Sequence, residues 1–171
     1  MAGMLGRPRP GGVGAGRALV ALLIFTTTIE FLLGTAVNLY TTCLPDGPMH
    51  LFSSDPCAAS SGQSILEAHV VVGVVLGLLA LALLFWAVRR RTPRVTGPAF
   101  GGFLGVVIAA IGGYEYLAIN PNPADYSFLM ALGFLMAFGA YMSAAFALRD
   151  YARTGGAAVR WMPPPASNPP P

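Results

Sequence analysis

Ionisable side chains interrupt stretches of this sequence that are otherwise apolar. Glu67 and His69 lie in "SILEAHVVVG" (residues 64–73), and Glu30 lies inside a second apolar stretch, residues 18–40. A carboxylate and an imidazole exchange protons and form hydrogen bonds, and an imidazole also ligates metals. Within a membrane such groups are costly and usually face the interior of a helix bundle or a water-filled cavity. They are therefore the first candidates for chemistry in this chain.

Helical periodicity places Glu30 and His69 among small and polar neighbours. Residues four apart share a helix face, and the two faces are Thr26, Glu30, Gly34 and Asn38, and His69, Gly73 and Gly77. The glycines beside His69 indicate either close helix packing, as in GxxxG faces, which we favour, or room for a flat cofactor bound by His69. Met130 is a second candidate ligand, although methionines in such helices usually fill packing gaps.

The polar side chains of the apolar stretches also predict a common environment. Glu30 and Asn38 lie in the first stretch, Glu67 at the start of the second and Glu115 near the end of the third. No arginine or lysine lies inside any stretch to neutralise them. We therefore expect a buried polar cluster of Glu30, Asn38, Glu67 and Glu115.

Both cysteines fall in one segment, residues 41–64, between the first two apolar stretches. We expect a disulfide between Cys43 and Cys57, which requires an oxidising compartment; free thiols are the alternative. A zinc site that combines these cysteines with His50 would lack a fourth ligand and a CxxC spacing. No metal site is therefore predicted.

The composition predicts an integral membrane protein. Of the 171 residues, 55% are hydrophobic and 10% charged, and the mean hydropathy is +0.64, outside the range of soluble domains. Crossing about 30 Å of hydrocarbon takes roughly 20 apolar helical residues, and four stretches are long enough: 18–40, 65–88, 98–118 and 126–148. We expect an all-α four-transmembrane-helix bundle at residues 18–148, a disordered segment 1–17, and a proline-rich tail 149–171.

The arginines predict the orientation of this bundle. All ten basic residues are arginines, and they precede the first stretch, separate the second from the third, or follow the fourth. The positive-inside rule then places both termini and the middle loop in the cytoplasm, and segment 41–64 outside. We expect a bacterial plasma-membrane protein whose net charge of +3 reflects topology, not nucleic-acid binding. Its expected partners are the lipid bilayer and other membrane proteins, or a second copy, through glycine-rich faces.

The order of these features resembles one four-helix half of the heme A synthase family of cytochrome oxidase assembly. The resemblance rests on "EFLLGTAVNL" (residues 30–39), the cysteine pair, and "ILEAHVVVGVVLGLLALALLFWAVRRRTP" (residues 65–93). It implies that His69 corresponds to the heme ligand of the second helix and Glu67 to the acid that precedes it. The chain also resembles small bacterial four-helix membrane proteins of unassigned function, which share a histidine in helix two and an "SFLMAL" type of helix four.

The resemblance to heme A synthases fails in the fourth stretch. The family supplies a second histidine there, whereas this chain has "FLMALGFLMAF" with Gly133 nearest to that position. Either Met130 or Met136 would have to replace the ligand, or two chains would each contribute His69 to a shared heme. The other four-helix half of the family is absent from these 171 residues, so synthase activity is not expected.

Three functions remain as hypotheses. We favour a non-catalytic accessory or assembly subunit, because small-residue faces are abundant and no complete catalytic set is present. The alternatives are a redox accessory protein that binds heme or a quinone at His69, and a proton or small-solute pathway through Glu30. An enzyme is disfavoured because the sequence has no GxSxG, P-loop, HExxH or dinucleotide-binding motif.

Overall fold

A computed structural model of the chain describes residues 11–40, 62–118 and 123–153. The described residues form four α-helices: α1 (Gly11–Tyr40), α2 (Gln63–Arg89), α3 (Pro93–Ala118) and α4 (Pro123–Arg153). Each is long and apolar enough to cross a membrane, which confirms the predicted all-α, four-helix architecture. The cysteines, Cys43 and Cys57, and His50 lie outside the described residues.

The helices extend beyond the apolar stretches that predicted them. α1 begins at Gly11, so it includes residues 11–17, which we expected to be disordered, and α4 continues to Arg153, past the expected end at 148. α3 begins at Pro93 instead of 98. Most of the added residues are polar, glycine or proline, which contribute little to a hydropathy signal although they can continue a helix. Pro93 takes the first helical position, where proline is favoured.

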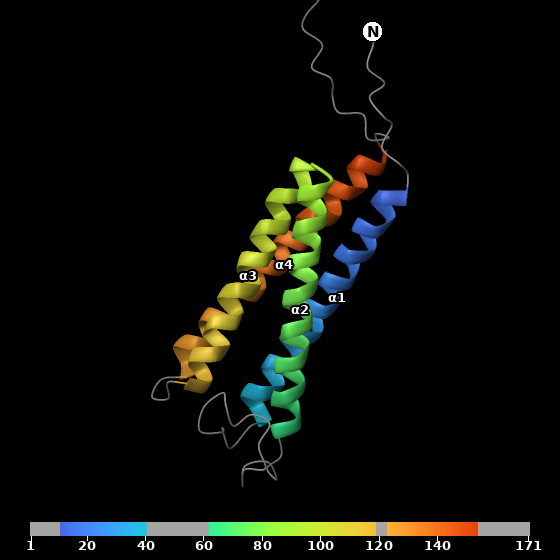
Figure 1. Ribbon diagram of the computed structural model, residues 1–171. Helices are drawn as coiled ribbons and strands as arrows, with labels where there is room; N and C mark the ends of the chain where they lie inside the picture. Colours follow the sequence, from blue (N-terminus) through green and yellow to red (C-terminus); the bar gives the residue numbers. More distant parts are fainter. Residues whose placement is uncertain (1–10, 41–61, 119–122, 154–171) are drawn as a thin grey trace, which may run out of the picture.

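The four helices form a ring in which each packs against its two neighbours. α1 contacts α2 and α4, α3 contacts α2 and α4, and the diagonal pairs do not pack against each other within the described chain. Consecutive helices are antiparallel, and α3 and α4 are the most extensively packed pair. Figure 1 shows α1 and α2 as one pair and α3 and α4 as another, converging at one end of the molecule and diverging at the other.

The two ends of the bundle differ in chemistry. The arginine end, where α1 and α3 begin and α2 and α4 end, carries Arg17, Arg89, Arg90, Arg91, Arg94, Arg149 and Arg153. The tyrosine end, where the opposite helix termini lie, carries Tyr40, Tyr114, Tyr116 and Tyr126. The helix pairs converge at the arginine end and diverge toward the tyrosine end (Figure 1).

The α3–α4 contact is built on glycines that let the two backbones touch. A Cβ added at Gly105 would lie 2.7 Å from the carbonyl oxygen of Gly133, and one at Gly133 would lie 2.6 Å from the carbonyl oxygen of Gly105. Close approach at small residues is a typical mode of helix association in lipid. Nearer the arginine end, the ring of the fully buried Tyr141 occupies the space beside Gly102.

A tight turn joins α2 to α3. The N–H of Arg91 donates to the carbonyl of Val88 at 3.0 Å, and the N–H of Thr92 donates to that of Ala87 at 3.2 Å. This pair of bonds is a Schellman motif, whose C′ position adopts the left-handed conformation and usually holds glycine. Here the position is Arg91, with φ of 51°. The turn fixes the two helices at the arginine end.

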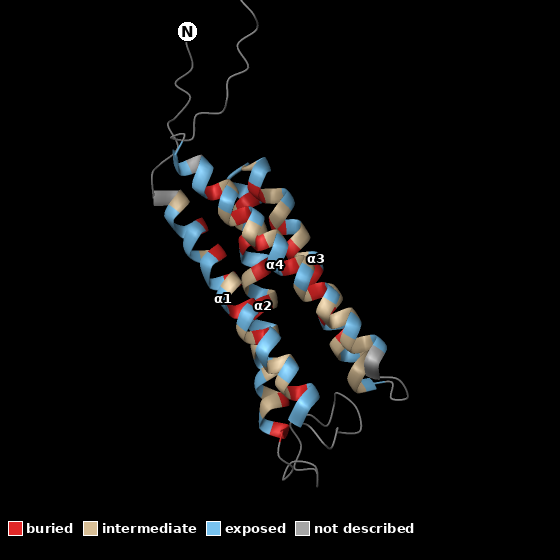
Figure 2. Ribbon diagram, turned by 180° about the vertical axis from the view of Figure 1, so that it is seen from behind, coloured by how far each residue is buried: buried red, intermediate tan, exposed pale blue. Residues whose placement is uncertain are grey.

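The main core lies toward the arginine end. The largest buried cluster draws on all four helices and consists of Val20, Leu23, Leu76, Ala80, Leu83, Ala87, Val95, Ala99, Ala137, Tyr141, Ala144 and Leu148. Among the described residues, the tyrosine end has a small cluster, Val37 and Leu66, against which Leu117 packs. Many large apolar side chains instead face outward, as the pale blue outer faces in Figure 2 show, which suits a lipid environment.

Candidate functional site

A pocket of about 670 Å³ lies between the two helix pairs, on the tyrosine side of the main core. All four helices contribute to its walls, which are mostly apolar. Its size is within the usual range of small-molecule sites, and such sites combine apolar walls with a few placed polar groups. In this pocket the charged or ionisable members of the lining are Glu30, His69, Tyr114 and Tyr116.

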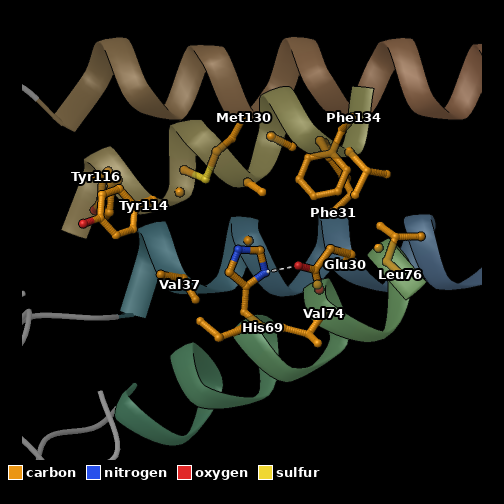
Figure 3. A pocket seen from close by; sticks show the side chains of 18 of the residues that line it. Glu30, Phe31, Val37, His69, Val74, Leu76, Tyr114, Tyr116, Met130 and Phe134 are labelled. Carbon is orange, nitrogen blue, oxygen red and sulfur yellow. Dashed lines mark ion pairs between the residues drawn. The ribbon is translucent and has the colours of Figure 1, made fainter. Parts of the chain in front are cut away.

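Glu30 of α1 and His69 of α2 form the polar centre of the pocket. The Nδ1 atom of His69 lies 3.1 Å from Oε1 of Glu30, which is ion-pair distance, and the two side chains are 14% and 5% exposed. Figure 3 shows the imidazole beside the carboxylate, with the apolar side chains of the pocket around them. The atoms are close but not aligned as a hydrogen bond, because Nδ1 has no partner of hydrogen-bond geometry.

Each member of this pair rests against a glycine of the opposite helix. A Cβ at Gly73 on α2 would lie 2.8 Å from Oε1 of Glu30, and a Cβ at Gly34 on α1 would lie 3.2 Å from Cε1 of His69. The two sequence faces that carry Glu30 and His69 therefore meet each other. The glycines are the reason that a carboxylate and an imidazole fit between two packed helices.

The second carboxylate oxygen, Oε2 of Glu30, is buried and has no hydrogen-bond partner among the described residues. Leaving such an atom unpaired costs about 1–3 kcal/mol, and more when the group is charged. Glu30 is ten residues from the end of α1 at Tyr40, so it lies about 15 Å from that end by helical rise. That distance is close to the middle of a hydrocarbon layer about 30 Å thick. The pocket therefore offers an unsatisfied polar atom at mid-membrane depth.

Contacts between described residues border the pocket on three sides. On the α1–α4 side, Phe31 and Phe134 make an edge-to-face contact with ring centres 6.4 Å apart, and the hydroxyl of Ser127 donates to Oδ1 of Asn38 at 3.3 Å. At the tyrosine end, Leu117 packs on the cluster of Val37 and Leu66. The main core closes the arginine end.

The fourth side, between α2 and α3, is open. Five large hydrophobic residues of the lining are at least half exposed, and four of them lie on α2 or α3: Val74 (59%), Leu78 (64%), Leu81 (50%) and Tyr114 (58%). The fifth, Phe31, is the one engaged with Phe134. Ala110 of α3 is also exposed and lines the pocket. The opening faces sideways, at the depth where a spanning helix meets lipid chains.

The other candidate residues from the sequence lie at different positions. Asn38 is exposed at the α1–α4 seam and lines the pocket, whereas Glu67 and Glu115 are partly exposed and are not among the lining residues. The side-chain amide of Gln63 donates to Oε1 of Glu67 at 3.3 Å. Of the four polar residues expected to cluster, the structure therefore brings only Glu30 and Asn38 to the pocket.

Met130 of α4 lies in the wall formed by the second helix pair, as Figure 3 shows. Its sulfur would lie 3.5 Å from a Cβ at Gly113, in ordinary packing contact. His69 and Met130 thus face one pocket from different helix pairs. No group of three potential metal ligands among histidine, cysteine, aspartate and glutamate occurs in the described part of the chain.

The aromatic and seam residues were not singled out by the sequence. Phe31, Phe134 and Ser127 look like ordinary members of apolar helices, and their role at the α1–α4 seam depends on which helices are neighbours.

No protein-family model matches the chain, and no curated protein and no solved structure shows significant similarity to it. The function of the chain is therefore inferred from the chemistry and geometry of this site.

Proposed function

We propose that this chain is a non-catalytic, membrane-embedded binding protein that holds a largely apolar small molecule between its two helix pairs. The observation that carries the proposal is the 670 Å³ pocket with the buried, unpartnered oxygen of Glu30 in its wall. A bound molecule would fill the space and satisfy that oxygen. Binding, unlike catalysis, requires no further reactive group.

A redox accessory role with heme or a quinone as the bound molecule is a second candidate. His69 supports it, because a ligating histidine usually directs its other ring nitrogen to a carboxylate or carbonyl, and Nδ1 lies 3.1 Å from Glu30. Nε2 would then be the ligating atom. Met130 in the opposite wall would supply a second axial ligand of a type known in cytochromes.

An accessory role toward other membrane proteins is compatible with ligand binding. A Cβ at Gly97 or Gly139 would meet nothing within 4 Å, so these small residues of α3 and α4 leave room for a further helix or a second copy. A proton or solute pathway through Glu30 has less support. On the arginine side of Glu30, the hydroxyl of Thr27 is used within its own helix, donating to Leu23 at 2.7 Å, and the core beyond is apolar.

For the cellular setting we propose the bacterial plasma membrane with the arginine end in the cytoplasm, on the basis of the positive-inside rule. The polar centre of the pocket then lies near the middle of the membrane, and Cys43 and Cys57 lie outside, where a disulfide can form. Labelling of single cysteines introduced at each end with a membrane-impermeant reagent tests this orientation. Labelling of the arginine end in intact cells would contradict it.

The binding function is tested on protein purified in mild detergent from heme-replete cells. Its absorption spectrum is recorded, and its organic extract is analysed by mass spectrometry. We expect one small molecule at a near-stoichiometric amount, which is lost in Glu30→Leu and in His69→Ala but kept in Glu67→Gln, the control outside the pocket. A Soret band identifies heme. An extract that contains only bulk phospholipid and is identical in all four proteins contradicts the proposal.

A further inference from the structure

From the polar centre and the side opening of the pocket, we infer that its ligand is a neutral amphiphile bearing a hydroxyl group, which enters from the bilayer between α2 and α3 and hydrogen-bonds to Glu30. This inference rests on the proposed binding function. It adds the chemical class of the ligand and its route of entry.

The ligand must form a hydrogen bond with Oε2 of Glu30. Oε2 of Glu30 is buried without a partner, whereas Oε1 is next to Nδ1 of His69. As a carboxylate oxygen, Oε2 accepts a hydrogen bond, and when protonated it donates one. A hydroxyl group complements both states because it donates and accepts. An ether or ketone only accepts, so it complements the protonated state alone.

The charges around the pocket favour a ligand with a neutral head group. No arginine of the described helices lines the pocket, and the chain contains no lysine, so within the described structure an anionic head would meet the carboxyl group of Glu30 with no compensating cation other than His69. A cationic head would compete with His69 for Glu30 and would lose its hydration among apolar walls, which is costly for any ion. A neutral head avoids both costs.

The ligand reaches the pocket through the opening between α2 and α3. Among the described residues, Phe31 contacts Phe134 on the α1–α4 side, Leu117 packs on Val37 and Leu66 at the tyrosine end, and the main core fills the arginine end. The remaining opening is lined by Val74, Leu78 and Leu81 of α2, which lie 11 to 18 residues from the start of α2 at Gln63. At about 1.5 Å per residue, this opening lies within the hydrocarbon layer. A molecule dissolved in the bilayer reaches it directly, whereas a charged head would have to cross hydrocarbon.

The ligand class is tested with four probes that share one alkyl chain: decanol, decyl methyl ether, decanoate and decylamine. The full-length protein is reconstituted in nanodiscs of saturated phosphatidylcholine, and each probe competes with a photoreactive decanol analogue whose attachment sites are mapped by mass spectrometry. We expect attachment to residues of the pocket and competition by decanol at a concentration at least about tenfold lower than by the other three. A tenfold difference corresponds to one hydrogen bond to a charged group.

The role of Glu30 is tested in the same assay. Glu30→Leu is expected to weaken competition by decanol about tenfold or more and to leave the ether unchanged, and Glu67→Gln is expected to change neither. Gel filtration verifies that each variant is folded, and Glu30→Met, whose side chain is similar in length and lacks a strong hydrogen-bonding group, replaces Glu30→Leu if the latter does not fold. If Glu30→Leu changes competition by decanol and competition by the ether to the same extent, the inference is contradicted.

Entry between α2 and α3 is tested by kinetics. Ala110→Trp places a bulky side chain at the opening, and Ala68→Trp, at an exposed position of α2 outside the pocket, is the control. We expect Ala110→Trp to slow association of the photoreactive probe severalfold, and Ala68→Trp to leave the association rate as in the unmodified protein. An unchanged association rate in Ala110→Trp contradicts this route.

The outcomes separate the inference from the proposed function. If none of the four probes protects the pocket, and no attachment occurs there, the binding function itself fails. If all four probes protect equally, the binding function stands and the hydroxyl class fails. If decanoate or decylamine protects best, the ligand is an anion or a cation and the inference is likewise overturned.

Discussion

Glu30 and His69 are held by glycines on each other's helices, and this reciprocal arrangement makes their environment sensitive to single methyl groups. Gly73 leaves the space that Oε1 of Glu30 fills, since a Cβ there would lie at 2.8 Å. The carboxylate is the far end of a flexible side chain, so it would move instead of the helix. That movement would separate it from His69.

Gly73→Ala is therefore expected to differ from Gly77→Ala although both lie on the same face of α2. Replacing glycine by alanine inside a helix gains about 0.5–1 kcal/mol, and at Gly77 nothing lies within 4 Å of the new Cβ, so that variant should show the gain in unfolding by sodium dodecyl sulfate. Gly73→Ala should show little or none of it and should bind the pocket ligand more weakly. Equal stability and binding in the two variants would contradict the role of Gly73.

At the residue scale the sequence predicted faces but not their partners. The four-residue spacing placed Glu30 with Gly34, and His69 with Gly73, and both sets occur on single helix faces in the structure. Periodicity within a helix carries no information about the rotation of a neighbouring helix. The contact between the two faces, and the separation of Glu67 and Glu115 from Glu30, required the tertiary arrangement.

At the element scale, the turn between α2 and α3 contains a strained residue. Arg91 has φ of 51°, a left-handed conformation that costs a residue with a Cβ roughly 1–2 kcal/mol. Arg91→Gly is expected to stabilise the protein by about 1 kcal/mol, because glycine adopts this conformation freely. Arg90 has φ of −80°, so Arg90→Gly, which removes the same charge, should be neutral or destabilising. The order of the two variants in thermal unfolding in detergent checks this expectation.

The α3–α4 pair depends on backbone contact at Gly105 and Gly133. A Cβ at Gly105 would lie 2.7 Å from backbone atoms of α4, and backbone cannot yield as a side chain does. Gly105→Ala is expected to destabilise the bundle by about 1–3 kcal/mol, the usual cost of overpacking.

Gly139→Ala on α4 is the matched control for Gly105→Ala, because its Cβ would meet nothing within 4 Å. The comparison is made by sodium dodecyl sulfate unfolding of both variants. A loss of stability in Gly139→Ala as large as in Gly105→Ala would indicate a general effect of alanine in these helices instead of a clash between backbones.

The helices themselves were largely predictable, and their mutual arrangement was not. Four apolar stretches identified the helices because length and hydropathy are what a bilayer selects. The stretches missed residues 11–17 of α1 and 149–153 of α4, which have polar residues or glycine. Small residues recur at steps of four on α3, at Gly97, Gly101, Gly105, Ala109 and Gly113, whereas the residues that approach α4 closely are Gly102, Gly105, Ala109 and Gly112. Residues three and four positions apart are neighbours on the surface of a helix, so these four residues lie along one face of α3.

At the scale of the whole molecule, the uneven core explains the pocket. Side chains such as Leu83, Tyr141 and Leu148 fill the bundle at the arginine end, whereas the other half, where the helix pairs diverge (Figure 1), encloses the pocket, with Gly34, Gly73, Gly77 and Gly113 among larger apolar residues in its walls. A protein selected for stability alone would fill such a space, because packing contacts in membrane bundles contribute to association. If the pocket has the proposed binding function, its unfilled space reflects a trade between stability and binding, which is common at functional sites.

This trade predicts the effect of filling the pocket from its wall. Gly77 lines the pocket with nothing near its Cβ position, so Gly77→Leu should gain about 0.5–1 kcal/mol from helix propensity and additional free energy from packing contacts. It should also exclude the ligand. Gly139→Leu gains the propensity without entering the pocket, so it should be less stabilising and bind normally. Unfolding by sodium dodecyl sulfate measures the stability of both variants, and photolabelling measures their binding. If Gly77→Leu is no more stable than Gly139→Leu, or if it still binds the probe, the space is not a binding site that lowers the stability of the protein.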